Sequence, residues 1–166
     1  MNTSKLGVEL YFAYGSCMGN DICRTVSTFR RLGRAHLQGW EIGFTRYSVS
    51  WGGGVADIVE SLGGEVEGVL YELDAEGLHR LDQREGVSFG IYQRIAVPIE
   101  TPDGNSITVW TYEVVDKSDV EYAPSYEYGT ILLRGAKEYT SHENFEILSE
   151  KIKSLQYENC LEREWI

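Results

Sequence analysis

The sequence has few cysteines, few prolines and no long hydrophobic run. Among its 166 residues are 3 Cys and 3 Pro. The three cysteines, Cys17, Cys23 and Cys160, show neither CxxC nor His-paired spacing, which favours reduced thiols over disulfides or a zinc site. No window approaches the ~20 apolar residues of a membrane helix, and the opening MNTSKLGVEL lacks the pattern of a signal peptide. We expect a cytoplasmic protein without a membrane partner and without a bound metal or cofactor.

The sequence is also short of basic residues, with 15 Lys+Arg against 26 Asp+Glu and a formal net charge of -11. A phosphate backbone would repel such a chain, so we expect no nucleic-acid partner. The length is that of one domain that buries roughly two thirds of its unfolded surface. We therefore predict a single domain over residues 1–166, ending in a charged tail (157–166) without a clear pattern. No long heptad run demands a partner, which favours a monomer.

Alternating apolar residues predict a body rich in strands. The alternation runs from Val8 to Tyr14 and stops at Gly15, which indicates a first strand. Further strands are predicted over residues 33–37, 40–47, 55–59, 66–73, 91–101 and 106–115. Asp103 and Gly104 lie between the last two, and this pair is typical of a tight hairpin. The pattern favours an antiparallel sheet or a small barrel.

Helical spacing appears first after Asp74, a good N-cap residue. Leu78, Leu81 and Glu85 then share one face, and Gly86 suits a left-handed C-cap.

Two further helices are predicted near the end of the chain. One follows Ser125 and runs from Tyr128 to Tyr139. The other opens with the pair Thr140 and Glu143, a capping box. Its inward residues are Phe145, Leu148, Ile152 and Leu155. Strands first and helices last predict an α+β fold.

Glu85 is the most informative candidate for chemistry. It continues the buried face of its helix, so its carboxylate is expected to point inward at a helix C-terminus. Burial, the helix dipole and the acidic background all disfavour the charged form and raise a carboxylate pKa. A raised pKa suits a general base near neutral pH. The alternative is a structural role, either in an ion pair with Arg84 or Arg94 or as a cap in solvent. Asp82 is a competing carboxylate that is expected at the surface or in a supporting role.

The turn after the first strand is the second candidate. Successive N–H groups at Gly15 and Ser16 can hold a carboxylate or a polarised carbonyl oxygen. Ser16 lacks the spacing of a nucleophile elbow. Cys17 is an alternative nucleophile, although the histidines available to it (His36, His79 and His142) have no informative spacing.

The glycine-rich stretch from Trp51 to Asp57 leads into a predicted strand. It has neither a P-loop ending nor dinucleotide-binding spacing, so a tight turn is the preferred interpretation.

An ordered set of short segments resembles the γ-glutamylcyclotransferase (AIG2-like) family. No single segment is specific, but their order from about residue 8 to residue 155 is. The segments are Tyr11 to Ser16, Trp51 to Ala56, Gly68 to Leu73, Leu81 to Val87, Pro124 to Tyr128, and Gly135 to Glu138. The resemblance implies an α+β fold around a small, mainly antiparallel β-barrel with flanking helices.

The same resemblance implies a reaction and the residues that perform it. The α-amine of a γ-glutamyl group attacks that group's own γ-carbonyl, which gives 5-oxoproline and releases an amine or amino acid. Glu85 is implied as the catalytic acid and base. The residues implied in substrate binding are Tyr11, Phe12, Ala13, Tyr14, Gly15, Ser16 and, from the far side, Tyr128.

The chain departs from the family pattern at Cys17, where the family commonly has Asn. One alternative is therefore a protein that binds γ-glutamyl ligands without turning them over, because fold alone does not give function. Another concerns the leaving group, which can be an amino acid, an amine, the remainder of glutathione or a larger natural product carrying a γ-glutamyl cap.

Overall fold

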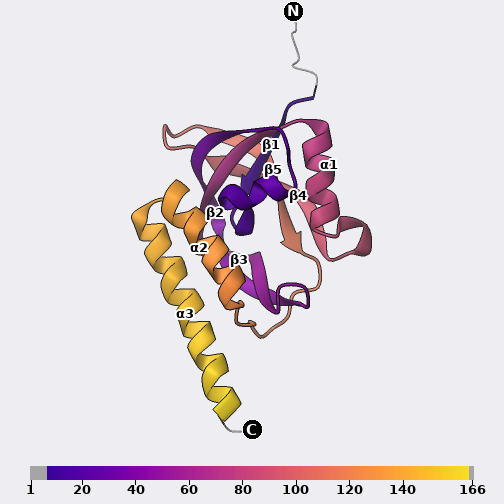
Figure 1. The fold of residues 1–166 in the computed structure, drawn as a ribbon. Coiled ribbons are helices and arrows are strands. Elements are labelled where there is room, and N and C mark those ends of the chain that lie inside the picture. The colour runs from indigo at the N-terminus through magenta and orange to yellow at the C-terminus, as the bar shows by residue number, and fades with distance from the viewer. Residues whose placement is uncertain (1–6, 165–166) are drawn as a thin grey trace, which may run out of the picture.

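The computed structural model describes residues 7–164 and centres on a closed barrel of five strands (Figure 1). The strands are β1 (Glu9–Ala13), β2 (Phe29–Ser48), β3 (Gly53–Leu73), β4 (Tyr92–Glu100) and β5 (Ser106–Val114). Their order around the barrel is β1-β3-β2-β4-β5. Every neighbouring pair is antiparallel except β1 with β5, where Tyr11 lies opposite Trp110 in a parallel pairing. The predicted α+β fold with a mainly antiparallel barrel is confirmed.

The barrel consists of two hairpins and a short first strand, joined by narrow seams. β2 pairs with β3 along nearly its whole length, and β4 pairs with β5 throughout. The turn of the second hairpin contains Asp103 and Gly104, as predicted. By contrast, β2 meets β4 at one recorded residue pair, His36 with Glu100, and β1 meets β5 only at Tyr11.

Two predicted breaks between strands were wrong, because glycines bend the strands of the first hairpin without ending them. Four predicted strands merge into two, residues 33–37 and 40–47 into β2, and residues 55–59 and 66–73 into β3. The register shifts between Gln38 and Trp40, next to Gly39 at φ +85°. Across the hairpin Gly63 has φ +78°. Positive φ lets these residues form a bulge at a barrel corner, where a side chain would be strained.

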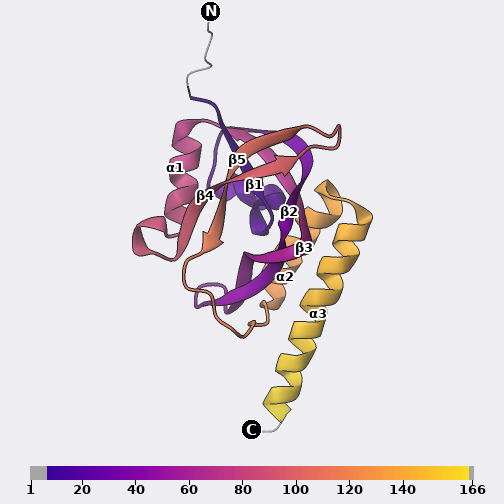
Figure 2. The ribbon, with the colours of Figure 1, turned by 180° about the vertical axis from the view of Figure 1, so that it is seen from behind.

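Three helices and three short 3₁₀ turns complete the described part of the chain. The helices are α1 (Ala75–Arg84), α2 (Tyr126–Tyr139) and α3 (His142–Glu164), and the 3₁₀ turns are η1 (Ser16–Met18), η2 (Asn20–Arg24) and η3 (Val87–Phe89). Figures 1 and 2 show α1 on one side of the barrel and the pair α2 and α3 on the other. In the described part of the chain, no helix combines the length and the apolar character needed to cross a membrane.

The caps of the helices agree with the sequence at α1 and differ at α3. Asp74 accepts a hydrogen bond from the Gly77 N–H at 2.7 Å, as an N-cap should. Thr140, predicted to open the last helix together with Glu143, instead ends α2. The side chain that caps α3 is Ser141, whose Oγ accepts from the Asn144 N–H at 3.1 Å.

The helix α3 also runs further than the sequence indicated. The predicted patternless tail continues it to residue 164, while residues 165 and 166 lie outside the described range. Leu148 and Ile152 are buried against the rest of the molecule. The residues beyond them are mostly exposed, yet a helix that is already anchored extends at little cost. Glu and Lys also have good helix propensity, so a charged composition alone did not argue against a helix.

Helix α2 is held against the start of the chain by a contact between two glycines. A Cβ on Gly135 would lie 2.6 Å from the backbone nitrogen of Gly19. The backbone of α2 therefore approaches the η1–η2 segment too closely for any side chain. This contact keeps the η1 turn, and the residues before it, in place beside α2.

Gly135→Ala should therefore destabilise the protein, by about 1–3 kcal/mol, because an added methyl forces α2 away from Gly19. The matched control is Gly129→Ala on the same helix, where the new Cβ would meet the Ile152 Cγ2 at 3.3 Å. That side chain can adjust, and Ala favours the helix, so the control should remain within about 1 kcal/mol of the parent. Urea unfolding of both variants tests this, and equal stabilities would contradict the close contact.

Candidate active site

A cavity of about 560 Å³ lies where the β1–η1 turn, the end of α1 and the β2–β3 turn meet the start of α2. Its lining residues are Tyr11, Tyr14, Gly15, Ser16, Cys17, Arg46, Tyr47, Ser48, Val49, Ser50, Trp51, Val55, Ala56, Arg84, Glu85, Ile91, Tyr92, Tyr112 and Tyr128. Five of these are tyrosines with no more than 8% of their surface exposed. The cavity is thus a cleft with aromatic walls, a size and character typical of small-molecule sites.

Glu85 reaches this cavity because of how α1 ends. Leu78 and Leu81 bury one face of the helix, and Glu85 follows one turn later, as its C-cap residue, with its N–H donating to the Leu81 carbonyl at 2.9 Å. The chain then turns at Gly86, whose φ of +66° needs glycine. The carboxylate is therefore set on the inward face just where the helix stops.

The Glu85 carboxylate is half-buried and has no counterion. Among residues 7–164 it forms no ion pair and accepts no hydrogen bond, so the predicted alternative of a pair with Arg84 or Arg94 does not occur. Burial raises the pKa of Glu85 to about 7, while the charge of Arg84 opposes the shift. A carboxylic acid with this pKa exchanges its proton near neutral pH.

The two arginines that were possible partners are engaged elsewhere. Arg84 donates to Asp21 Oδ2 at 2.7 Å and to Ser16 Oγ at 2.9 Å. Arg94 lies 3.4 Å from Asp82 Oδ2. Asp82 in turn accepts from the Tyr112 hydroxyl at 2.6 Å. Asp82 therefore contacts a cavity tyrosine without lining the cavity itself.

Three of the cavity tyrosines are oriented by hydrogen bonds with backbone atoms. Tyr14 donates to the Tyr112 carbonyl at 2.6 Å, which ties the end of β1 to β5. Tyr92 donates to the Ala56 carbonyl at 2.7 Å, and the Ala56 N–H donates to the Tyr128 oxygen at 3.0 Å. One peptide segment of β3 thus fixes two tyrosines that come from β4 and α2.

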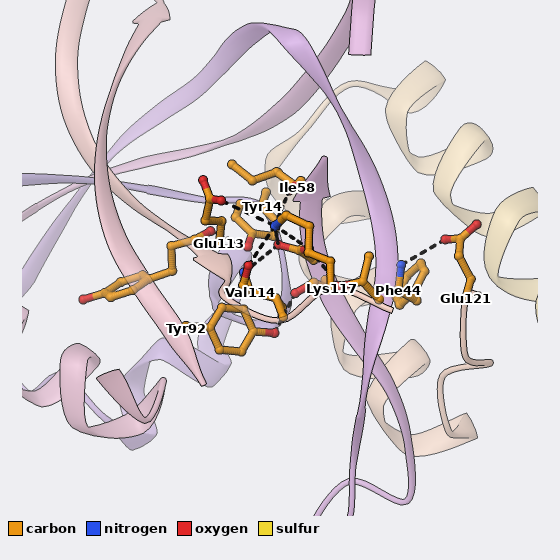
Figure 3. A network of polar contacts seen from close by, with 12 residues as sticks. Tyr14, Phe44, Ile58, Tyr92, Glu113, Val114, Lys117 and Glu121 are labelled. Carbon is orange, nitrogen blue, oxygen red and sulfur yellow. Dashed lines mark hydrogen bonds and ion pairs between the residues drawn. The ribbon is translucent and has the colours of Figure 1, made fainter. Parts of the chain in front are cut away.

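The residue after Ala56 is Asp57, which is fully buried at the centre of a polar network. Its carboxylate accepts from Thr45 Oγ1, the Val114 N–H and Lys117 Nζ, each at 2.8 Å. Figure 3 shows the Lys117 ammonium also reaching the carbonyls of Ile58 and Val114. Three strands are therefore joined next to the Ala56 segment by one neutralised carboxylate.

The structure brings most of the predicted site residues together. Six of them line the one cavity, namely Tyr11, Tyr14, Gly15, Ser16, Glu85 and Tyr128. Phe12 and Ala13 do not line it, and both are completely buried. Residues along a strand alternate in direction, so Phe12 points away from Tyr11, while its carbonyl accepts from Thr111 Oγ1 at 2.8 Å.

Cys17 lines the cavity but is a poor nucleophile. Burial raises the pKa of its thiol to about 12, so almost none is present as thiolate at neutral pH. None of the three histidines proposed as partners, His36, His79 and His142, lines the cavity.

Several cavity residues were not identified from the sequence. Arg46 and Tyr112 lie on long strands whose twist and register decide which side chains face inward, and one sequence does not reveal either. Tyr92 and Arg84 lie within elements that were predicted, but their partners come from distant segments. Trp51 was noted only as part of a turn, yet it packs edge-on against Tyr128 at 5.1 Å.

Comparison with known proteins identifies similar chains. The model of the AIG2-like family matches residues 65–145. The chain is 35% identical over 136 residues to the gamma-glutamylcyclotransferase of Bos taurus, covering 78% of this chain and 70% of that protein. It is 36% identical over 149 residues to a putative gamma-glutamylcyclotransferase, YkqA, of Bacillus subtilis, covering 87% of this chain and 52% of that protein. A solved gamma-glutamyl cyclotransferase structure superposes with a TM-score of 0.80 at 33% identity, covering 86% of each chain.

The raised pKa of Glu85 predicts a pH-dependent effect on stability. The folded value of about 7 lies above the ordinary 4.5, so the fold favours the protonated form. That contribution is complete below pH 4.5 and is lost as the pH rises through 7. Glu85→Gln stays neutral, so its stability relative to the parent should increase between pH 5 and pH 8. Urea unfolding at both values measures the difference, and a constant difference would contradict a desolvated carboxylate.

The network around Asp57 predicts a large effect at Lys117. Lys117→Met leaves a buried carboxylate without its cation and should cost roughly 3 kcal/mol. Adding Asp57→Asn removes the uncompensated charge, so the double variant should recover part of the loss. Lys153→Met, an exposed change of the same kind, serves as the control. Urea midpoints compare the four proteins, and a Lys117 variant as stable as the control would contradict the network.

Proposed function

The chain belongs to the gamma-glutamylcyclotransferase family and is an enzyme of this type; we propose that it cyclises a γ-glutamyl compound to 5-oxoproline and releases the attached amine or amino acid. The observation that carries the proposal is the half-buried, unpaired Glu85 carboxylate, with a pKa of about 7, facing a cavity walled by tyrosines. Such a group can both accept and return a proton at neutral pH.

The proposed reaction needs one bond to form and one to break. The glutamyl ammonium first loses a proton to the Glu85 carboxylate. The free amine then attacks the γ-carbonyl carbon, and the new C–N bond closes the five-membered ring. The bond to the leaving nitrogen breaks as Glu85 returns the proton to it, and the second proton of the ring nitrogen also passes to this amine, which departs as its ammonium. Because amine and carbonyl belong to one molecule, holding the glutamyl chain in a folded conformation supplies much of the rate.

The other predicted residues are proposed to hold the glutamyl group. The N–H groups of Gly15 and Ser16 open the η1 turn, where N–H groups lack helical partners, so they can bind the substrate carboxylate. A Cβ on Gly15 would lie 3.5 Å from the Tyr128 oxygen, so glycine leaves room for a ligand there. Tyr11 and Tyr14 form the wall, and Phe12 and Ala13 support the segment from the core.

We expect Glu85→Gln to abolish 5-oxoproline release, a loss of at least about 100-fold in kcat, because the amide cannot carry the proton. In the parent, kcat/KM should fall as the pH drops below about 7, since only the carboxylate can accept the proton. Mass spectrometry of 5-oxoproline from a panel of γ-glutamyl amino acids, amines and glutathione measures both.

The control for this experiment is Glu76→Gln, which removes an exposed carboxylate from the same helix. It should leave turnover unchanged. Undiminished product from the Glu85 variant would refute the assignment. Binding of a γ-glutamyl compound by the parent without product would instead favour a binding protein, the role that Cys17 in place of the family's Asn keeps open.

A further inference from the structure

The charged residues of the cavity include one cation that the reaction has not used. Three charged side chains line the cavity, Arg46, Arg84 and Glu85. Arg84 is occupied by Asp21 and Ser16. Within residues 7–164, Arg46 has no ion pair and no side-chain hydrogen bond, although its charge acts on the cavity and lowers the pKa of Tyr92 against the effect of burial. A half-buried guanidinium without a partner is suited to an anionic ligand.

Arg46 lies at the mouth of the cavity. It is on β2 just before the turn to β3, opposite Val55. The next lining residues along the chain are open to solvent, with Tyr47 49% and Val49 90% exposed. The walls around Glu85 are shielded from solvent, since Tyr11 and Tyr14 are only 5% and 6% exposed. The cavity therefore has a closed end near Glu85 and an open end near Arg46.

We propose that Arg46 binds a carboxylate on the leaving half of the substrate, and that it thereby selects γ-glutamyl amino acids or peptides over γ-glutamylamines. This inference rests on the proposed function. It makes Arg46 a specificity-determining residue that contacts the substrate away from the reacting atoms. A planar guanidinium offers two parallel N–H donors to a carboxylate, which a simple amine leaving group lacks.

The position of Arg46 favours the leaving half over the glutamyl half. The glutamyl α-carboxylate shares its carbon with the amine that must reach Glu85, so both groups belong at the closed end. The chain beyond the γ-carbonyl leads toward the open end, where Tyr47 and Val49 add an apolar rim. A carboxylate there meets Arg46 as the only cation available among the described lining residues.

The test uses two substrates that differ only in this carboxylate, γ-glutamylphenylalanine and γ-glutamylphenethylamine. A charge-assisted hydrogen bond is worth about 1.5–3 kcal/mol, so the parent should prefer the acid by about 10- to 100-fold in kcat/KM. Arg46→Met should remove that preference by raising KM for the acid, with kcat nearly unchanged, because the contact is the same before and during the reaction. Turnover of the amine should change by less than about twofold.

Two further variants define the control. Arg46→Lys keeps the charge but loses the planar fork, so it should restore part of the preference. Arg34→Met removes an exposed arginine of the same strand and changes the net charge equally, so it should leave both substrates unaffected.

The remaining outcomes overturn distinct statements. Equal losses on both substrates in Arg46→Met would mean that Arg46 serves the glutamyl half or the fold, and would overturn the inference. A parent enzyme that releases 5-oxoproline equally from both substrates would overturn the inference and leave the proposed function standing. No 5-oxoproline from either substrate would overturn the proposed function, and the role of Arg46 with it.

Discussion

Arg84 and Glu85 are adjacent in the sequence and opposite in charge, yet the fold keeps them from pairing. Asp21 provides the counterion that Arg84 would otherwise find in Glu85, and Ser16 accepts a second hydrogen bond from it. The arginine thereby joins the η1–η2 segment to the end of α1, and Glu85 remains a desolvated carboxylate. The same contact that closes the molecule around the cavity thus preserves the proton affinity of its carboxylate.

Three tyrosines of the cavity are held by backbone atoms. Tyr14 donates to the Tyr112 carbonyl, and the Ala56 segment orients both Tyr92 and Tyr128. Asp57, the next residue, anchors this segment through hydrogen bonds from Thr45, Val114 and Lys117. Burying these charges costs desolvation free energy. In return, the satisfied network restricts the motion of the cavity wall. The proposed cyclisation depends on orientation and would require such rigidity.

The sequence predicted the secondary-structure elements better than the contacts between them. Local signals sufficed for Asp74, Gly86 and Gly104, because caps and tight turns involve only a few neighbouring residues. They failed at Gly39 and Gly63, where a glycine can equally end a strand or bend it. The inward position of Glu85 could be predicted because helical spacing and a helix end are visible in the sequence. Arg46, Tyr92 and Tyr112 were missed, because their part in the site depends on barrel register and on contacts between distant segments.

The strand pairings of the barrel differ in length, and this difference should set the order in which they form. Its two hairpins, β2 with β3 and β4 with β5, are nearly local in sequence, whereas the pairings of β1 with β5 and of β2 with β4 join distant segments through single recorded rungs. Closing a long loop for so few contacts is an entropic cost that comes late in folding. The hairpins should therefore assemble before the barrel closes, and the cavity, which needs β1 beside β5, would be completed only in the last step. Most of the barrel would then be folded before the proposed substrate site exists.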